Sequence, residues 1–481
     1  MTGEAPAARL ARRIGSDPLL RAIAAEAARQ DLEVYAVGGL VRDILLRRRA
    51  RDVDLIAGAG AGGLLSWLAE RSSHRPVTFA KRVVNHRLTI GGRTVDVVEL
   101  GERSLAEELA RRDFTIDAIA WDLRYGRLVD PCGGLGDLAE ARLRPPRPDA
   151  FRCDPLRLLR AVRLRAEIPR LTPDAETERR MAAEAPLLAR AAPERIREEI
   201  DRTFLTPRGG RAMAEADRLG LIEPWLPESR PLRGLIQNRY HHLDAWRHTL
   251  AALAAADRPR RLAPGLLPPR WPRVPADPEG PPRPDPDEAR LVLRWALLLH
   301  DLGKAATRAL NRRGEVSFHG HETVGERIAK EVTRRLAFPG PRAEAVARLV
   351  RLHLRLVIPP EGRLSERALA RIARAAGPYT ELLALHALAD QLASRGVGWR
   401  RTRRRLLDTV AALFEVEREI DARRRRGRLL TGRDVLDRLG IAPGPRVGEI
   451  LREAERLRDL GELETREQAL AWLERWRPDR A

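Results

Sequence analysis

Cysteine is scarce in this sequence: Cys132 and Cys153 are its two cysteines among 481 residues. Two cysteines cannot build a disulfide framework or a zinc ribbon, and they fit a reducing cytoplasm. No stretch approaches the roughly 20 apolar residues that a membrane span needs. The best candidate, 291–299, is short and contains Arg294. The basic N-terminal residues have no apolar block behind them, so we expect no signal peptide and a cytoplasmic protein without a membrane partner.

Lysine and aromatic residues are also scarce, with three lysines and an aromatic fraction of 4%. Lysine and arginine nevertheless total 89 against 68 acidic residues, which gives a net charge of +21. Such a surplus favours a polyanionic partner, because neutralising phosphates releases counterions. The few aromatic residues argue against a stacking platform for single-stranded nucleic acid. The arginine content also has a simpler explanation in genomic composition.

Hydrophobic periodicity divides the chain near residue 150. Before that point, strands and helices alternate, which is typical of a compact α/β domain. The expected elements are a helix within 1–30, a strand at 33–39, a helix at 40–48, a strand at 52–57 and a hairpin at 87–100 that turns at Gly91 and Gly92. After residue 150 the pattern is helical, first over 154–166, 174–190, 194–204 and 208–219. The Pro-rich stretch 257–288 predicts a disordered loop, and helical patterns resume at 289.

Two aspartates, Asp52 and Asp54, lie two residues apart on a predicted strand. Their side chains project from the same face, and adjacent carboxylates repel unless a cation lies between them. Mg²⁺ prefers such oxygen ligands together with substrate phosphates. Upstream, Gly38 and Gly39 separate a strand from a helix start, where backbone N–H groups can hold phosphate. Together these features indicate a nucleotidyl-transfer site that uses two metal ions.

Four ordered motifs carry a resemblance to a known family. The segment GGLVRDILLRRRARDVDLIA resembles the signature of the tRNA nucleotidyltransferase and poly(A) polymerase family of the polymerase-β superfamily. RRDFTIDAIAWD, DPLRLLRAVRLRA and APERIREEI are similar to three further motifs of that family, and the segment at 429–451 resembles the tail of bacterial members. The resemblance implies an α+β fold with a polymerase-β-like nucleotidyltransferase head, built on a mixed sheet, followed by an all-α neck, body and HD domain.

The resemblance also implies roles for individual residues. Asp52 and Asp54 would bind catalytic Mg²⁺, and Asp96 takes about the place of a third carboxylate. The nucleotide, ATP or CTP, would be bound by a larger set. This set comprises Gly38, Gly39, Arg42 and Asp43 at the triphosphate, Arg112 and Asp113 at the ribose and phosphates, Asp154 and Arg157 at the base, and Arg160 and Arg163 on the same helix.

Simpler structural roles remain open for some of these residues. Asp154 followed by Pro155 also fits a helix N-cap, Arg112 and Asp113 could form an ion pair, and Asp96 could be an exposed strand residue. The sequence departs from the family pattern at two positions. Asp117 stands where the family usually has Asn, and Cys153 stands where Glu often precedes the Asp-x-x-Arg pair. A carboxylate cannot donate a hydrogen bond as Asn can, so the first departure would alter contacts near the nucleotide.

Histidines and aspartates in the helical half suggest a second site. Imidazoles and carboxylates from separate helices suit a transition metal, and their order here resembles the HD phosphohydrolase domain. On that resemblance the core ligands are His248, His300, Asp301 and Asp390, with His321 and His353 as additional ligands of a two-metal site. The site would take a divalent transition metal or Mg²⁺, and Lys304 could hold a phosphate. We interpret His241, His242, His319 and His386 as structural or surface residues.

The leading hypothesis is a tRNA nucleotidyltransferase that adds CTP- and ATP-derived nucleotides to the 3′-terminal CCA of tRNA. Alternatives are an enzyme that adds only CC or only A, a poly(A) polymerase, and an HD phosphohydrolase of RNA ends with a vestigial head. We expect the head at 1–148, a tRNA-binding neck at 149–235, the HD domain at 236–400 and a helical tail at 401–481. We place the flexible loop that distinguishes CCA from CC addition at 75–92, and an RNA contact at 422–428. The oligomeric state stays open.

Overall fold

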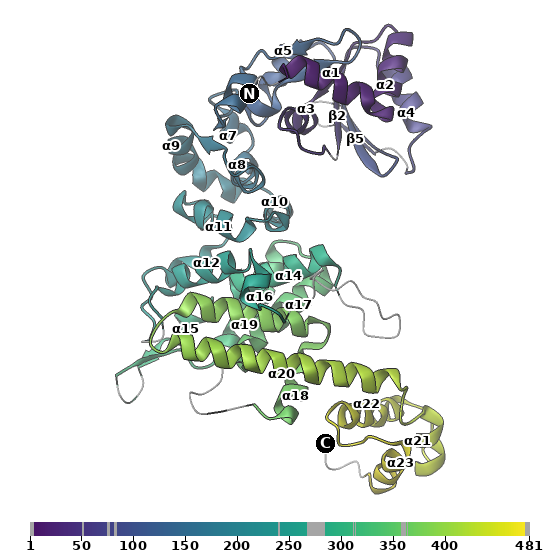
Figure 1. The fold of residues 1–481 in the computed structure, drawn as a ribbon, viewed down its shortest axis with the longest axis vertical. Coiled ribbons are helices and arrows are strands. Elements are labelled where there is room, and N and C mark those ends of the chain that lie inside the picture. Colours follow the sequence, from purple (N-terminus) through teal and green to yellow (C-terminus); the bar gives the residue numbers. More distant parts are fainter. Residues whose placement is uncertain are drawn as a thin grey trace. The chain divides into compact units, whose positions relative to one another are not determined.

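The computed structural model describes residues 4–50, 52–74, 77–80, 84–238, 241–266, 284–310, 312, 314–356, 362 and 364–476 (Figure 1). The chain forms two compact units, residues 1–191 and 192–481. Across these described ranges, every helix is too short or too polar to cross a membrane.

The first unit is built around a seven-stranded mixed sheet. Its strand order is β3-β4-β5-β2-β1-β6-β7, in which the β2–β5 pair is parallel and the other pairs are antiparallel. The strands are β1 (Val34–Val37), β2 (Val53–Ala57), β3 (Val77–Ala80), β4 (Val84–Ile90), β5 (Arg93–Glu99), β6 (Ala120–Asp122) and β7 (Leu128–Val129). The helices before and between them are α1 (Pro6–Ser16), α2 (Pro18–Arg29), α3 (Gly38–Leu45), α4 (Gly62–Ala69), α5 (Leu105–Ala110), the 3₁₀ turn η1 (Thr115–Asp117) and α6 (Gly134–Ala139).

The strand β1, the helix α3 and the hairpin all occur as the sequence predicts, although β1 ends at Val37 and α3 begins at Gly38, two residues before the predicted boundary. Gly91 and Gly92 both have positive φ, 57° and 74°, which a two-residue turn between β4 and β5 requires. The prediction of one helix in 1–30 is wrong: two helices occur there. Asp17 interrupts them because its carboxylate accepts the N–H groups of Leu19 and Leu20 and so caps the second helix.

The prediction of a loop at 75–92 is also wrong, because most of that segment is strand. β3 and β4 pair antiparallel, and β4 pairs with β5 from Asn85 to Ile90. Residues 75–76 and 81–83 lie outside the described residues. Polar and apolar residues alternate in this segment, as in a β-strand, and its strands extend the edge of the sheet. The loop prediction did not take this alternation into account.

Short elements complete the first unit. They are β8 (Arg142–Leu143), α7 (Ala150–Cys153), α8 (Leu156–Glu167), β9 (Thr172–Pro173), α9 (Ala175–Glu184) and the 3₁₀ helix η2 (Ala185–Arg190). The expected helix over 174–190 therefore divides at Ala185, beside Pro186, which has no N–H to continue the α-helical ladder.

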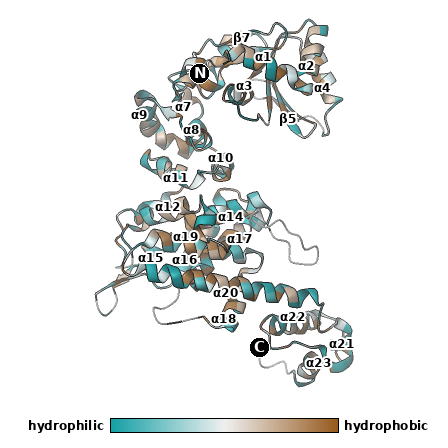
Figure 2. Ribbon diagram, viewed as in Figure 1, coloured by the Kyte–Doolittle hydropathy of each residue, from teal (hydrophilic) through white to brown (hydrophobic). Residues whose placement is uncertain are grey.

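The second unit is almost entirely helical. Its elements up to the C-terminal tail are α10 (Pro193–Leu205), α11 (Gly209–Arg218), η3 (Pro227–Leu232), α12 (Ala245–Ala255), α13 (Pro259–Leu262), α14 (Pro286–Leu299), α15 (Lys304–Thr307), β10 (Ala309–Leu310), β11 (Val316–Ser317), α16 (His321–Arg335), α17 (Gly340–Leu352), η4 (His353–Leu356), α18 (Glu366–Ala376), η5 (Gly377–Tyr379), α19 (Thr380–Ser394) and α20 (Trp399–Arg425). Helices α14 and α19 are buried along most of their length, and most of their residues are hydrophobic (Figure 2). Both pack against α12, which brings the polar ends and faces of three helices together.

The limits predicted for the Pro-rich loop, 257–288, are too wide. The side chain of Asp257 is buried at the start of this stretch, residues 259–262 form α13, and α14 already begins at Pro286. Residues 267–283 lie outside the described residues. The carboxylate of Asp257 accepts the N–H groups of Gly210 and Arg211 at the start of α11, so it belongs to the helical core.

The tail carries three helices, α21 (Gly432–Leu439), α22 (Pro445–Asp459) and α23 (Arg466–Arg475), around a small apolar core of their own. Asp459, at the end of α22, is 1% exposed and binds Arg374 of α18 and Arg424 of α20 at 3.1 and 2.7 Å. Part of the basic run at 422–428 therefore fastens the tail to the helices before it.

Candidate active site and metal centre

The candidate active site begins with a row of polar residues across the sheet of the first unit. Asp54 on β2 lies directly beside Asp96 on β5, and Asp96 lies opposite Arg87 on β4. Neighbouring residues in register project from the same face of a sheet, so the two carboxylates are adjacent. Asp52 is exposed, one residue before β2 begins. The predicted carboxylates are thus brought together, and Asp96 is partly buried instead of fully exposed.

Gly38 packs closely on this acidic row. Its φ is +68°, and a Cβ atom there would lie 2.7 Å from both Asp54 Oδ2 and Arg112 Nη1. Glycine is therefore required for conformation and for space. Burial raises the pKa of Asp54, and the Asp96 and Asp117 carboxylates raise it further, against the opposing effects of Arg112 and of the Gly39 N–H. A cation bound between the carboxylates would relieve this repulsion, so the residues fit a Mg²⁺ site.

Arg42 lies beneath the glycine pair and is 7% exposed. Its Nε donates to Asp43 Oδ1 at 3.0 Å, and its Nη1 donates to Asp117 Oδ1 at 2.6 Å. Burial raises the pKa of Asp117, whereas Arg42 acts to lower it. Arg42 therefore links the start of α3 to η1. Asp117, at the position where the family usually has Asn, accepts one of its hydrogen bonds, and Asp43 accepts the other.

Asp113 does not pair with its neighbour Arg112. Its carboxylate accepts from Arg157 Nε at 2.8 Å and from Arg160 Nη1 at 2.6 Å, both on α8. Burial alone would raise the pKa of Asp113, but the two guanidinium groups outweigh it and lower the pKa. Arg157 also donates to the carbonyl groups of Ala150 and Arg111. The alternative of a simple ion pair between Arg112 and Asp113 is therefore wrong, because Asp113 is linked to α8 instead.

The remaining predicted residues lie on or next to α8. Asp154 precedes the helix, and its Oδ1 accepts the N–H of Leu156 at 3.2 Å, which resembles the predicted capping role. Arg163 donates to Glu167 at 2.8 Å. Cys153 is an exposed free cysteine whose Sγ lies 3.4 Å from Asp149 Oδ2.

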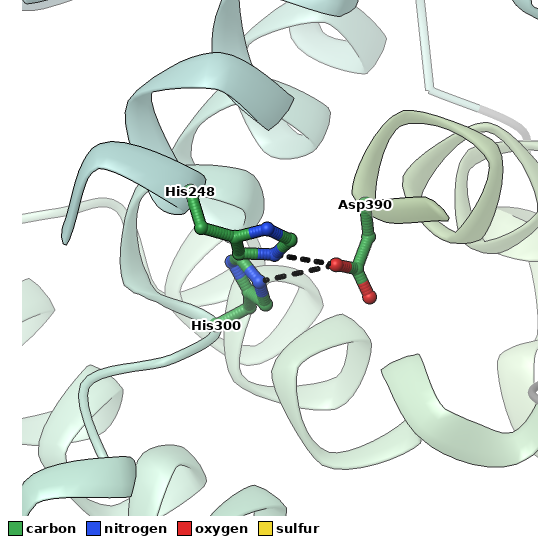
Figure 3. A group of neighbouring side chains, drawn as sticks. All are labelled: His248, His300 and Asp390. Atoms are coloured by element: carbon green, nitrogen blue, oxygen red, sulfur yellow. Dashed lines mark hydrogen bonds and ion pairs between the residues drawn. The ribbon is translucent and has the colours of Figure 1, made fainter. Parts of the chain in front are cut away.

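A second cluster forms in the helical unit, where two groups of three side chains each could hold a metal ion. The groups are His248, His300 and Asp390, and Asp301, His321 and His353. Figure 3 shows the first group, in which His248 and His300 point toward Asp390. All six predicted residues meet here, although they lie in or directly after five separate helices, α12, α14, α16, α17 and α19.

The hydrogen bonds fix which ring nitrogen faces the cluster. The Nδ1 atoms of His300, His321 and His353 lie 2.6–2.8 Å from backbone carbonyl oxygens three residues earlier. A carbonyl only accepts, so each Nδ1 carries a hydrogen, and His321 and His353, when neutral, present a lone pair at Nε2. The Nε2 atoms of His321 and His353 face one another at 3.1 Å. Two facing lone pairs call for a cation between them, so this chemistry fits a metal ion.

Asp301 connects the two groups of the cluster. One oxygen lies 3.2 Å from His300 Nε2, and the other lies 3.5 Å from His321 Nε2. Burial lowers the pKa of both His321 and His353, which keeps them neutral, whereas burial of His300 is outweighed by Asp301 and its pKa is raised. The Lys304 ammonium group donates to Asp301 at 2.7 Å and to Gln237 at 2.6 Å.

Comparison with known proteins matches three segments to described families. Residues 34–144 match "Poly A polymerase head domain", residues 170–232 match "Probable RNA and SrmB- binding site of polymerase A", and residues 251–395 match "HD domain". The chain is 36% identical over 451 residues to an A-adding tRNA nucleotidyltransferase of Deinococcus radiodurans, covering 92% of this chain and 94% of that protein. It is 34% identical to a CC-adding tRNA nucleotidyltransferase of Thermus thermophilus, covering 93% and 94%. The chain belongs to the tRNA nucleotidyltransferase family.

A solved structure agrees with the fold of this tRNA nucleotidyltransferase family member. The Thermotoga maritima CCA-adding enzyme complexed with tRNA has a TM-score of 0.59 at 20% identity and covers 96% of this chain and 97% of its own. The expected α+β head and all-α remainder are therefore confirmed, and the protein is an enzyme of the nucleotidyltransferase class.

Sequence reasoning missed several residues at the two sites of this family member. Arg87 binds Asp96, and Gln237 binds Lys304. His386, which we interpreted as a structural or surface residue, is fully buried, and its ring lies 5.1 Å from that of His300. His386 precedes Asp390 by four residues on α19, so helical spacing could have placed it beside the cluster. Nothing in the sequence pairs Arg87 with Asp96 until the register of the hairpin is known.

Proposed function

We propose that this protein adds CTP- and ATP-derived nucleotides to the 3′ end of tRNA and completes its CCA terminus. The observation that carries the proposal is the half-buried, in-register pair Asp54 and Asp96 beside the glycine turn at Gly38. The tRNA 3′-hydroxyl attacks the α-phosphate of the nucleotide, and pyrophosphate leaves. This activity would take place in the cytoplasm.

Each part of the site has a role in that reaction. Asp52, Asp54 and Asp96 would hold Mg²⁺, which supplies charge neutralisation and a more reactive hydroxyl when bound. Backbone N–H groups at the start of α3 and the Arg112 guanidinium group, beside Asp54, would bind the triphosphate. The ties from Asp113 to Arg157 and Arg160 hold α8 against this site, where Asp154 and Arg157 would contact the base. The surplus of arginine would bind tRNA through its phosphates and shape.

The test is incorporation of labelled CTP and ATP, with Mg²⁺, into tRNA transcripts that end before CCA, after C and after CC. Two CTP additions followed by one ATP addition support the proposal. Incorporation should be lost in Asp54→Asn and retained in Asp31→Asn, an exposed acid of the same unit. Full activity of the Asp54→Asn protein would refute the assignment.

A second candidate is a single step of CCA synthesis, performed together with a partner enzyme. It is favoured by the comparisons: the A-adding and CC-adding relatives match over 92–93% of this chain, whereas a multifunctional CCA protein of Halorhodospira halophila matches over 67%. ATP addition limited to the CC-ended transcript, or arrest after CC, would support this candidate. Long ATP tails would indicate a poly(A) polymerase.

We infer a second activity at the cluster of six histidine and aspartate side chains in the helical unit, called here the HD cluster. This activity is metal-dependent hydrolysis of phosphate esters at RNA ends. The facing Nε2 atoms of His321 and His353 support it, because a divalent transition metal or Mg²⁺ there would activate water. The substrates to test are RNAs with 2′,3′-cyclic and 3′-phosphate ends. His353→Ala should remove hydrolysis while tRNA extension persists, and Asp54→Asn should have the opposite effect. Hydrolysis by the His353→Ala protein would refute this inference.

A further inference from the structure

Arg87 is the cation that pairs with Asp96 in the acidic row of the first unit. It forms two hydrogen bonds with Asp96, from Nε to Oδ1 and from Nη2 to Oδ2, each 2.8 Å long. Both oxygens of Asp96 are therefore engaged. A two-pronged pair of this kind is the strongest geometry for arginine and a carboxylate.

The position of Arg87 follows from the sheet register. Arg87, Asp96 and Asp54 occupy matching positions on β4, β5 and β2, so they form one continuous row on one face. The Asp96 carboxylate therefore lies between a guanidinium group and the Asp54 carboxylate. The Asp96 ion pair raises the pKa of Arg87, and Asp52 and Asp54 contribute in the same direction.

The two partners differ in their freedom to move. The Arg87 side chain is 53% exposed, whereas that of Asp96 is 19% exposed. Arginine on a long, solvent-facing stem can swing away at small cost, whereas the short Asp96 side chain is held by the central strand. A metal ion that uses Asp96 as a ligand competes with Arg87, because both cations draw on the same two oxygens and repel one another at that short range.

We propose that Arg87 and the catalytic metal ion compete for the Asp96 carboxylate, and that metal binding releases Arg87 toward the polyanionic nucleotide. Arg87 is thus a positioning residue that closes the acidic row in the free enzyme and becomes an additional phosphate contact in the loaded one. The proposal rests on the proposed nucleotidyl-transfer site and names a residue that regulates its metal occupancy.

The test measures Mn²⁺ binding to the full chain by electron paramagnetic resonance, without tRNA or nucleotide. Because the HD cluster can also bind Mn²⁺, each protein is compared with the same protein carrying Asp54→Ala, and the difference gives the binding of the head. Arg87→Met should tighten that binding roughly threefold to tenfold, the range expected for removal of a well-formed but half-exposed ion pair. Arg87→Lys should also tighten it, because lysine keeps the charge but loses the fork.

Two controls separate competition from a general change of charge. Arg93→Met removes one positive charge from the same hairpin, where Arg93 pairs with Asp17 at 2.6 Å and lies three positions from Asp96, on the opposite face of β5. It should leave Mn²⁺ binding unchanged. In an Asp96→Asn background, Arg87→Met should no longer tighten Mn²⁺ binding, because the carboxylate for which Arg87 and the metal ion compete is absent.

Three results would overturn the proposal. They are unchanged or weaker Mn²⁺ binding in Arg87→Met, a gain that persists in the Asp96→Asn background, and equal Mn²⁺ binding with and without Asp54→Ala. The third would also remove the metal from the proposed head site, whereas a failure of tRNA extension with intact Mn²⁺ binding would refute only the proposed reaction.

Discussion

The close packing of Gly38 on the acidic row predicts the effect of adding one methyl group. In Gly38→Ala the new Cβ atom would lie 2.7 Å from both Asp54 Oδ2 and Arg112 Nη1, so at least one of these groups must move. The φ of +68° adds a backbone cost of about 1–2 kcal/mol for an L-residue. A displacement of the carboxylate on the order of 1 Å costs about 100-fold in rate when that group positions the reaction.

The next residue provides a matched control. A Cβ atom at Gly39 would meet Arg42 Nη2 at 3.5 Å and Asp54 Oδ2 at 3.9 Å, which are ordinary contacts, and Gly39 lies within α3. Gly39→Ala should therefore be neutral, or stabilise α3 by up to about 1 kcal/mol. The assay measures CTP and ATP incorporation into tRNA transcripts, alongside urea unfolding of each protein.

The expected result is that Gly38→Ala reduces kcat much more than its loss of stability explains, whereas Gly39→Ala extends tRNA normally. Equal activity of the two proteins would show that the Asp54 carboxylate is not confined by Gly38, and the reasoning from close packing would be refuted.

Further predictions concern ion pairs elsewhere in the chain. Arg294→Met should lower the free energy of unfolding in urea by about 3–5 kcal/mol, because it leaves the buried Asp257 carboxylate, 2.8 Å away, without its counter-charge. Adding Asp257→Asn to the same protein should recover part of that loss. An Arg294→Met protein as stable as the wild type would contradict this reasoning. Because folding lowers the pKa of Asp113, its ion pairs stabilise the fold fully at a pH above 3.8, the ordinary pKa of the group. This contribution is lost as the pH falls through the lower pKa of Asp113 in the folded protein. The difference in unfolding free energy between wild type and Asp113→Asn should therefore shrink from pH 7 to pH 3, and a constant difference would rule out the ion pair as its source. Asp459→Asn should lower the free energy of local opening of the tail by about 1–3 kcal/mol, which hydrogen exchange over α21–α23 measures as faster exchange. Asp437→Asn, at an exposed site on α21, should leave this exchange unchanged. Equal exchange in both variants would count against the role of Asp459.

Much of the fold follows from local patterns that each segment carries by itself. Alternation and glycine placement predict β1, the start of α3 and the hairpin at Gly91 and Gly92, because turn and strand preferences act within a few residues. Helical periodicity predicts most of the second unit. The errors are local as well: Asp17 divides one expected helix in two, and strands replace the loop expected at 75–92.

The motifs of the sequence determined the family, the acidic pair of the head and the six residues of the HD cluster. Only the tertiary structure decided which partners these residues have. Asp113 binds Arg157 and Arg160 instead of Arg112, and Arg87 takes both oxygens of Asp96. These pairings join residues from separate elements, so they depend on sheet register and helix packing. A sequence motif shows which chemical groups are present. Their charges and their free lone pairs depend on the neighbours that folding brings within about 3 Å.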